Sequence, residues 1–172
     1  MIGEHRNPGD AWVVAEDGNR YWGRFGAAGL LAHDPERGIL LQHRVDWSHH
    51  GGTWGIPGGA RHEGENSVDA AIRESHEEAG VPFDAVRPKY AYVIDRGGWT
   101  YTTIIAQVVL SFEPQIMDPE SHALEWIPVA EVESFDLHPG FGASWPLLRP
   151  LLSSDSDAAA QLVADGQLVS LV

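Results

Sequence analysis

One stretch, from Gly58 to Val81, constrains the fold of this chain more than any other, and it reads GGARHEGENSVDAAIRESHEEAGV. Its second half predicts an amphipathic helix, because small and apolar residues recur on one side at helical spacing: Val68, Ala71, Ile72, Ser75 and Ala79. Three carboxylates, those of Glu74, Glu77 and Glu78, gather on another side. Carboxylates this close repel one another, and a multivalent cation neutralises the repulsion. The alternative is a solvated acidic face in which Arg73 pairs with Glu77.

Composition limits what else the chain can be. With 172 residues, of which 43% are hydrophobic, it is long enough for one well-cored domain, and we expect residues 1–172 to form one. No stretch reaches the roughly 20 apolar residues of a membrane helix, and the start MIGEHRNPGDAW lacks the order of a signal peptide. We therefore expect a soluble cytoplasmic protein with no membrane partner. Because cysteine is absent, oxygen or imidazole ligands must hold any metal.

The formal net charge of −14 argues against a nucleic-acid polymer as the partner, because such proteins neutralise phosphates with Lys and Arg. A small anionic ligand remains compatible with this charge if divalent cations intervene and invert the local field. The alternative is that the acidic surplus keeps the surface soluble.

The order of expected elements predicts an α+β fold, a mixed sheet packed between helices, because it lacks the regular alternation of a doubly wound parallel sheet. An Asp-Gly turn predicts an N-terminal hairpin at about 11–23. The double glycine at 58–59 is expected to form a turn, and Gly80 to end the central helix. Strands are expected at 25–32, 38–44, 53–57, 89–95, 99–110 and 121–127, helical segments at 128–133 and 145–152, and either helix or strand within 155–172.

Eight positions of the central stretch stand at fixed spacing. Gly59 is followed after five residues by Glu65, and after seven more by the run Arg73-Glu74-Ser75-x-Glu77-Glu78-x-Gly80-Val81. This pattern resembles the signature box of the Nudix hydrolases, and it is far more specific than paired glycines before a helix. Ser75 departs from the family, which normally has a bulky aliphatic residue there, so we expect a cost in packing. Weaker similarity extends to 53–59 upstream and to 125–132 downstream.

The resemblance implies an α/β/α sandwich and metal-dependent hydrolysis of a phosphoanhydride in a nucleoside diphosphate-linked compound. It also implies Mg²⁺ or Mn²⁺ as the cofactor, since a polyphosphate must approach several carboxylates. Carried over by position, the metal ligands are Glu77, Glu78, Glu74 and the carbonyl of Gly58. Glu74 is metal ligand or general base, because the base differs among family members. Arg73 and Glu65 orient or support the glutamates.

Candidates outside the box rest on weaker patterns. Those for contacts with the substrate are Arg44, Trp47 and Glu125, with His49 and His50 beside them in the DWSHHGG loop. Trp47 is the best candidate for stacking on a base. Glu120 and Glu125 are candidates for an additional acidic ligand. The alternative for each is an ordinary surface position.

The resemblance leaves the substrate open. A nucleoside triphosphate, an oxidised one included, cleaved to a monophosphate and pyrophosphate is favoured. An ADP-ribose or nucleotide-sugar pyrophosphatase is the alternative, but the proline typical of the ADP-ribose branch, about sixteen residues past the box, is absent from 95–99. A non-catalytic nucleotide-sensing domain usually loses box glutamates, and this chain keeps them. A calcium-binding structural helix predicts stabilisation without hydrolysis. The hairpin or the tail QLVSLV offers a surface for a homodimer.

Overall fold

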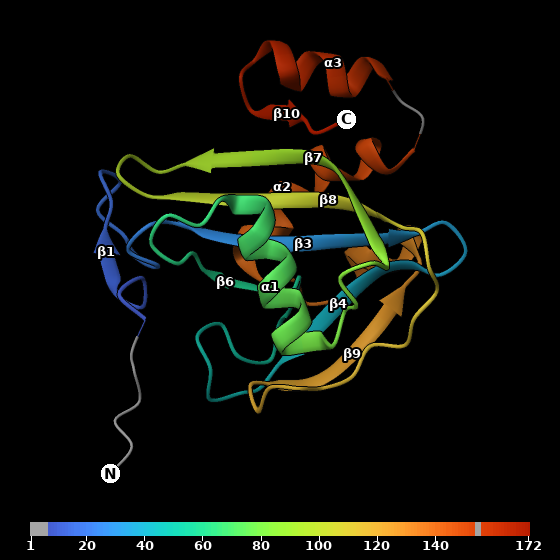
Figure 1. Cartoon of the computed structure of the whole chain (residues 1–172), viewed down its shortest axis with the longest axis horizontal. Helices are drawn as coiled ribbons and strands as arrows, with labels where there is room; N and C mark the ends of the chain where they lie inside the picture. Colours follow the sequence, from blue (N-terminus) through green and yellow to red (C-terminus); the bar gives the residue numbers. More distant parts are fainter. Residues whose placement is uncertain (1–6, 154–155) are drawn as a thin grey trace.

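A mixed eight-stranded sheet forms the centre of the computed structural model, which describes residues 7–153 and 156–172 (Figure 1). The strands, in chain order, are β1 (Trp12–Val14), β2 (Arg20–Trp22), β3 (Ala27–Asp34), β4 (Gly38–Arg44), β5 (Trp54–Gly55), β6 (Gly58–Ala60), β7 (Val86–Asp95), β8 (Thr100–Val108), β9 (Ser121–Ile127) and β10 (Leu168–Ser170). The large sheet has the order β10-β7-β8-β3-β4-β5, while β6 pairs with β3 and β9 with β4. Strands β3 and β8 run parallel, and the other pairs are antiparallel.

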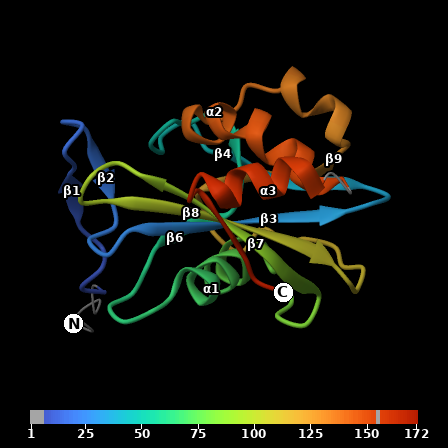
Figure 2. The ribbon, with the colours of Figure 1, turned by 90° about the horizontal axis from the view of Figure 1, so that it is seen from above.

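Helices cover both faces of this sheet, which confirms the expected α/β/α arrangement. They are α1 (Ser67–Ala79), α2 (Pro139–Leu148) and α3 (Ser156–Ala164), with 3₁₀ helices η1 (Val129–Ser134) and η2 (Arg149–Leu152). Figure 2 shows α1 on one face and α2 and α3 on the other. Successive residues of β3 explain the two layers, because Leu30 packs in the core beneath α1 and Leu31 in the core beneath α2. Among the described residues, no helix is both long and apolar enough to cross a membrane.

Local chemistry sets both ends of α1, of which the sequence predicted the one at Gly80. The side chain of Asn66 caps the first turn by accepting from the Asp69 N–H at 2.8 Å. Gly80 ends the helix in the left-handed conformation, with φ 66°. Ser75 is completely buried, and its hydroxyl donates to the carbonyl of Ile72 at 3.0 Å. Its polar atom is therefore satisfied inside the helix, and small residues let α1 lie close to β3.

Two expectations about local structure were wrong. The double glycine is a strand, not a turn: in β6, Gly58 opposes Gly29 and Gly59 opposes Ala28. A Cβ on Gly58 would stand 2.6 Å from the carbonyl oxygen of Ala28, so only glycine allows this approach. Helix α2 begins at Pro139 rather than near 145, because the His138 side chain caps it and proline suits a first turn.

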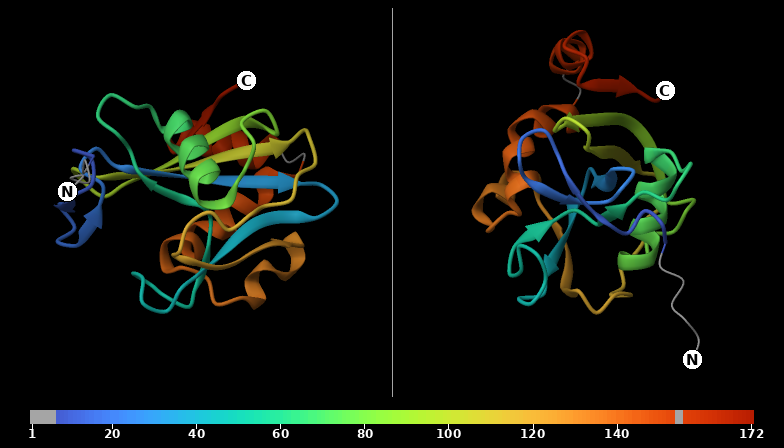
Figure 3. Two further views of the ribbon diagram at one scale, coloured as in Figure 1. Left: turned by 60° about the horizontal axis from the view of Figure 1, so that its bottom comes forward. Right: turned by 90° about the vertical axis from the view of Figure 1, so that its left-hand side faces the viewer.

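The expected N-terminal hairpin is confirmed, and it forms a separate two-stranded sheet at one end of the large sheet (Figure 3). The C-terminal segment contains both alternatives, since α3 is followed by β10; Asp155 itself lies outside the described residues. That residues 1–172 form one domain, and that the chain forms a homodimer, stay predictions.

Candidate active site

The guanidinium of Arg73 holds the acidic residues of the box in one network. Its Nε donates to Oε2 of Glu65 at 2.9 Å and its Nη2 to Oε1 of the same carboxylate at 3.0 Å, a bidentate pair. Its Nη1 donates to Glu74 at 3.0 Å and to Glu77 at 3.2 Å, and its Nη2 also donates to the carbonyl of Ala60. The hydrogen bond from Arg73 lowers the pKa of Glu65, which stays ionised. Arg73 therefore positions three glutamates and joins α1 to β6.

Glu74 and Glu78 reach from α1 to the two glycines of β6. The N–H of Gly58 donates to Oε2 of Glu78 at 3.0 Å, and a Cβ on Gly59 would stand 2.6 Å from the carboxyl carbon of Glu74. Burial raises the pKa of Glu74 to about 7, with Arg73 acting in the opposite direction. Burial, and next the charge of Glu74, holds the pKa of Glu78 well above its ordinary value. Both carboxyls therefore favour the neutral form more than an exposed glutamate does, and a cation beside them would favour the ionised form.

A divalent cation bound beside Glu74 and Glu78 would offset the cost of burying their ionised carboxylates. Glu74 and Glu78 offer carboxylate oxygens of the kind that hard cations prefer, and the side chain of Glu77, 55% exposed, is held at the surface by its ion pair with Arg73. Within residues 7–153 and 156–172, no three His, Asp or Glu side chains stand close enough to hold a metal as they are. The residues therefore suit a hard cation, provided that the glutamates rearrange around it.

Next to β6 a cavity of about 610 Å³ opens, and Gly58 and Gly59 form part of its wall. This volume lies within the usual range of small-molecule sites, roughly 300–1,000 Å³. The remaining wall comes from the hairpin, from the loop after β4, from the ends of β7 and β8, and from the start of α2. We call Arg73 with Glu65, Glu74, Glu77 and Glu78 the acidic network, and β6 the glycine strand. The acidic network thus adjoins one large cavity through the glycine strand.

The cavity is rich in cationic groups although the protein is strongly acidic. Arg20, Arg44 and Arg96 line it, and in the described part of the chain none of the three forms an ion pair with a carboxylate. The Nε of Arg44 donates only to the carbonyl of His49, at 3.0 Å. His49 and His50 also line the cavity. Such a wall suits an anionic ligand.

His138 is a neutral member of this wall that the sequence did not indicate. Burial lowers its pKa to about 4, and the nearby side chains of His50 and Arg44 act in the same direction. Its Nδ1 accepts from the Gly140 N–H at 3.1 Å, at the start of α2. The neutral ring therefore carries its proton on Nε2 and can donate it to a ligand.

The residues singled out in the sequence divide into two groups. The box residues and Arg44 lie at the acidic network or in the cavity wall, whereas Trp47, Glu120 and Glu125 are absent from that wall. Trp47 is 70% exposed in its loop, and Glu125 is exposed on β9.

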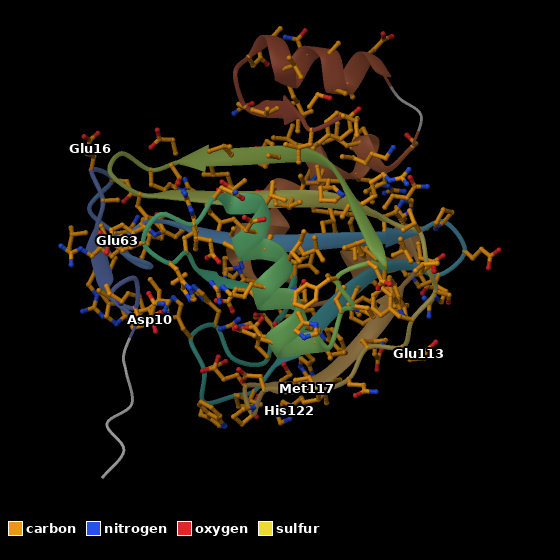
Figure 4. All side chains as sticks on the ribbon, in the orientation of Figure 1. Asp10, Glu16, Glu63, Glu113, Met117 and His122 are labelled. Carbon is orange, nitrogen blue, oxygen red and sulfur yellow. The ribbon has the colours of Figure 1, made fainter. Side chains whose placement is uncertain are left out.

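Three further polar residues near the glutamates escaped notice in the sequence. The charge of Asp118, in the loop before β9, raises the pKa of Glu78. The charge of Asp10, just before the hairpin (Figure 4), raises the pKa of Glu74 in the same way. The hydroxyl of Tyr101 lies beside Gly58, and burial, then the charge of Glu78, raises its pKa. The alternation of β8 could have indicated Tyr101, but neither aspartate stands in a recognisable motif.

Comparisons with known proteins agree with this geometry. Residues 23–148 match the family described as NUDIX domain. A protein of Mycobacterium tuberculosis named "Putative 8-oxo-dGTP diphosphatase 3" is 45% identical over 154 residues, which cover 84% of this chain and 70% of that protein. A "Nucleoside triphosphate pyrophosphatase/Nudix hydrolase fusion protein" of Bifidobacterium longum is 40% identical over 162 residues, 90% of this chain and 33% of that protein. A solved structure of the Nudix hydrolase RenU from M. smegmatis is 45% identical, with a TM-score of 0.72, and the match covers 83% of this chain and 94% of that one.

Proposed function

Since this chain belongs to the Nudix family of pyrophosphohydrolases, we propose that it hydrolyses a nucleoside triphosphate, an oxidised one included, to a monophosphate and pyrophosphate. The observation that carries this proposal is the junction, at Gly58 and Gly59, of an acidic network with a cavity lined by arginines that form no ion pair with a described carboxylate. The acidic network suits cations, and the cationic wall of the cavity suits phosphates. An anionic ligand with its cations can therefore contact both regions at once. The similarity to the M. tuberculosis protein supports the choice of a triphosphate.

In this proposal the cofactor is Mg²⁺ or Mn²⁺, and its ligands are Glu77, Glu78, Glu74 and the Gly58 carbonyl. When bound, the ion offsets the phosphate charge and lowers the pKa of a water molecule. The carboxyl of Glu74 has a pKa near 7 without metal, a value suited to taking a proton from water. Its role as ligand or as base stays open.

The remaining residues have binding and positioning roles in the same proposal. Glu65 fixes the guanidinium of Arg73 through their bidentate pair, and Arg73 in turn orients Glu74 and Glu77. Arg44 contacts phosphate, because it lines the cavity and, within the described residues, its Nη atoms form no hydrogen bond. Water attacks a phosphorus atom, the anhydride P–O bond breaks, and pyrophosphate departs with the bonding electrons.

The test is a panel of nucleotides offered with Mg²⁺ or Mn²⁺ to the wild type, Glu77→Gln and Glu78→Gln. Because each variant removes a charge that holds the ion, we expect turnover to fall at least about a hundredfold. The matched control is Glu63→Gln, an exposed glutamate of the loop before α1 (Figure 4), which keeps wild-type turnover.

The reaction products identify which phosphoanhydride bond is cleaved and in which substrate. Monophosphate plus pyrophosphate from a triphosphate supports the proposal, and AMP plus ribose phosphate from ADP-ribose points to the alternative substrate. Turnover that is absent for every nucleotide, or undiminished in both variants, overturns the catalytic assignment.

A further inference from the structure

The N-terminal hairpin forms one wall of the cavity, although it precedes residues 23–148, the part of the chain that matches the family. The residues that it contributes to the wall are Trp12, Asn19, Arg20, Tyr21 and Trp22. We propose that this hairpin binds the nucleobase of the substrate, with Trp12 and Trp22 as the stacking surface. The inference rests on the proposed function, because it assumes that the cavity takes a nucleotide.

Strand alternation separates the two faces of the hairpin. The pairs are Trp12 with Trp22, Val13 with Tyr21, and Val14 with Arg20, so Val13 and Tyr21 share one face while the tryptophans lie on the other. Val13 and Tyr21 pack into a small core with Ala15, Ala27 and Trp99. The tryptophans take no part in that core, and they are 45% and 39% exposed. Their position is therefore not explained by the core that holds the hairpin, and both present aromatic surface to solvent.

Contacts with the large sheet fix the hairpin, which matters because an isolated two-stranded hairpin is only marginally stable. Tyr21 stacks on Trp99, with ring centroids 4.2 Å apart and planes within 10°. The N–H of Glu16 donates to the carbonyl of Gly97 at 2.8 Å, in the turn between β7 and β8. The N–H of Gly23 donates to the carbonyl of Ala11 at 2.9 Å, which closes the other end. The exposed tryptophans thus stand on a rigid support, as a selective binding surface requires.

The two tryptophans present aromatic surface that suits a base. Their rings meet edge to face, with centroids 5.3 Å apart and planes at 71°. The guanidinium of Arg20 lies over the Trp12 ring, 4.7 Å from its centroid, and the rings of His49 and Trp12 meet edge to face with centroids 5.8 Å apart. These neighbours hold Trp12 at the edge of the cavity. Every base has a π face that can stack on such a ring, and arginine adds a donor for a carbonyl at the edge of the base.

The position of this wall matches the shape of a nucleotide. The wall of the cavity includes Gly58 and Gly59, which adjoin the acidic network, and also the hairpin, Arg44 and Arg96. A ligand with its phosphates beside the glycine strand can therefore extend its base to the tryptophans without leaving the cavity. Trp47 has no such position, because it is not part of the wall.

The experiment compares binding of dGMP with binding of inorganic pyrophosphate, which has the charge but no base. Calorimetry in Mg²⁺ is carried out on the wild type, Trp12→Ala, Trp22→Ala and Val14→Ala. Val14 is the matched control, since it is exposed on the same face as the tryptophans and does not line the cavity. We expect each tryptophan variant to weaken dGMP roughly tenfold or more and to change pyrophosphate affinity less than about twofold. Val14→Ala keeps wild-type values for both ligands.

The outcomes separate this inference from the function on which it rests. Unchanged dGMP affinity in both tryptophan variants overturns the base-binding role, even if the enzyme cleaves triphosphates. Equal weakening of both ligands together with a lower unfolding temperature means that the tryptophans are structural, and it also overturns the role. In the remaining case, a second copy of the chain covers the tryptophans. Light scattering would then show a wild-type dimer that the tryptophan variants no longer form, while dGMP affinity stays unchanged, and this result also overturns the role. Loss of dGMP binding alone supports the inference even when no triphosphate is hydrolysed.

Discussion

The acidic network and the cavity beside it are built in different ways. The acidic network comes from one continuous stretch, 58–81, in which α1 carries the glutamates and β6 lies against them. The aromatic and cationic wall of the cavity joins the hairpin, the loop after β4 and the start of α2, which are far apart in sequence. The network follows from local spacing, whereas the cavity wall exists only when distant segments pack together. Substitutions in the two regions should therefore affect different quantities, and three predictions test this comparison.

The largest expected effect is on the free energy of unfolding, and it comes from Glu74 in the acidic network. In the unfolded chain the carboxyl of Glu74 ionises near its ordinary pKa of 4.5, whereas burial raises the pKa in the folded protein to about 7. The metal-free protein therefore loses stability as the pH rises through this interval, by on the order of 3 kcal/mol once the pH exceeds 7. Glu74→Gln removes this loss, so the variant should be more stable than the wild type at about pH 8 and similar to it below pH 4.5.

Urea unfolding in the presence of EDTA measures this difference. Glu63→Gln serves as the control, because Glu63 is an exposed loop residue outside the network, and it should follow the wild-type dependence on pH. A Glu74→Gln variant with the same pH dependence as the wild type would show that burial of this carboxyl carries no cost.

The next effect concerns how Arg73 positions the glutamates. Lysine keeps the charge but cannot reproduce the bidentate pair with Glu65 while also donating to Glu74 and Ala60. Arg73→Lys should therefore weaken Mn²⁺ binding roughly ten- to a hundredfold, the usual cost of losing support behind metal ligands. Calorimetric titration with Mn²⁺ measures it, and Arg87→Lys, at an exposed position of β7, is the matched control. Equal Mn²⁺ affinity in both variants would contradict the positioning role.

The smallest effect is expected at the cationic wall. Arg44→Ala removes a guanidinium from the cavity and should raise KM for a triphosphate roughly tenfold, because a hydrogen bond to a charged group is lost. Its kcat should change less than its KM, since in the described structure Arg44 acts on Glu78 through its charge and forms no hydrogen bond with the glutamates. Initial rates at two salt concentrations measure this, and the KM of the variant should depend less on salt. Arg87→Ala is the control, and a fall in kcat with KM unchanged would place Arg44 at the reacting end instead.

Much of the fold followed from the sequence, and the errors have physical reasons. Helix α1 ends at Gly80 and β9 has the bounds 121–127, both as predicted, because a glycine cap and alternation are local signals. The strand at Gly58 and Gly59 was read as a turn, because nothing local indicates that β3 and α1 leave room only for glycine there. The start of α2 was placed too late, since its cap by His138 was not recognised.

The exposed tryptophans illustrate the limit most clearly. Trp47 stands in a loop near two histidines and was the candidate for stacking, yet the exposed tryptophans that line the cavity are Trp12 and Trp22. Alternation predicts which residues of a hairpin share a face, but it does not predict what that face meets. That depends on Tyr21 stacking on Trp99, about 80 residues away along the chain.

The sequence by itself determined the family, the helix that carries the glutamates, and the register that brings Arg73 to Glu77. These depend on the helical period and on fixed spacing within about 24 residues, so they need no knowledge of the remaining chain. Only the tertiary structure decided which aromatic and cationic side chains face the glycine strand, and that burial raises the pKa of Glu74 and Glu78. Both depend on how segments distant in sequence pack and exclude water, which is a property of the whole fold.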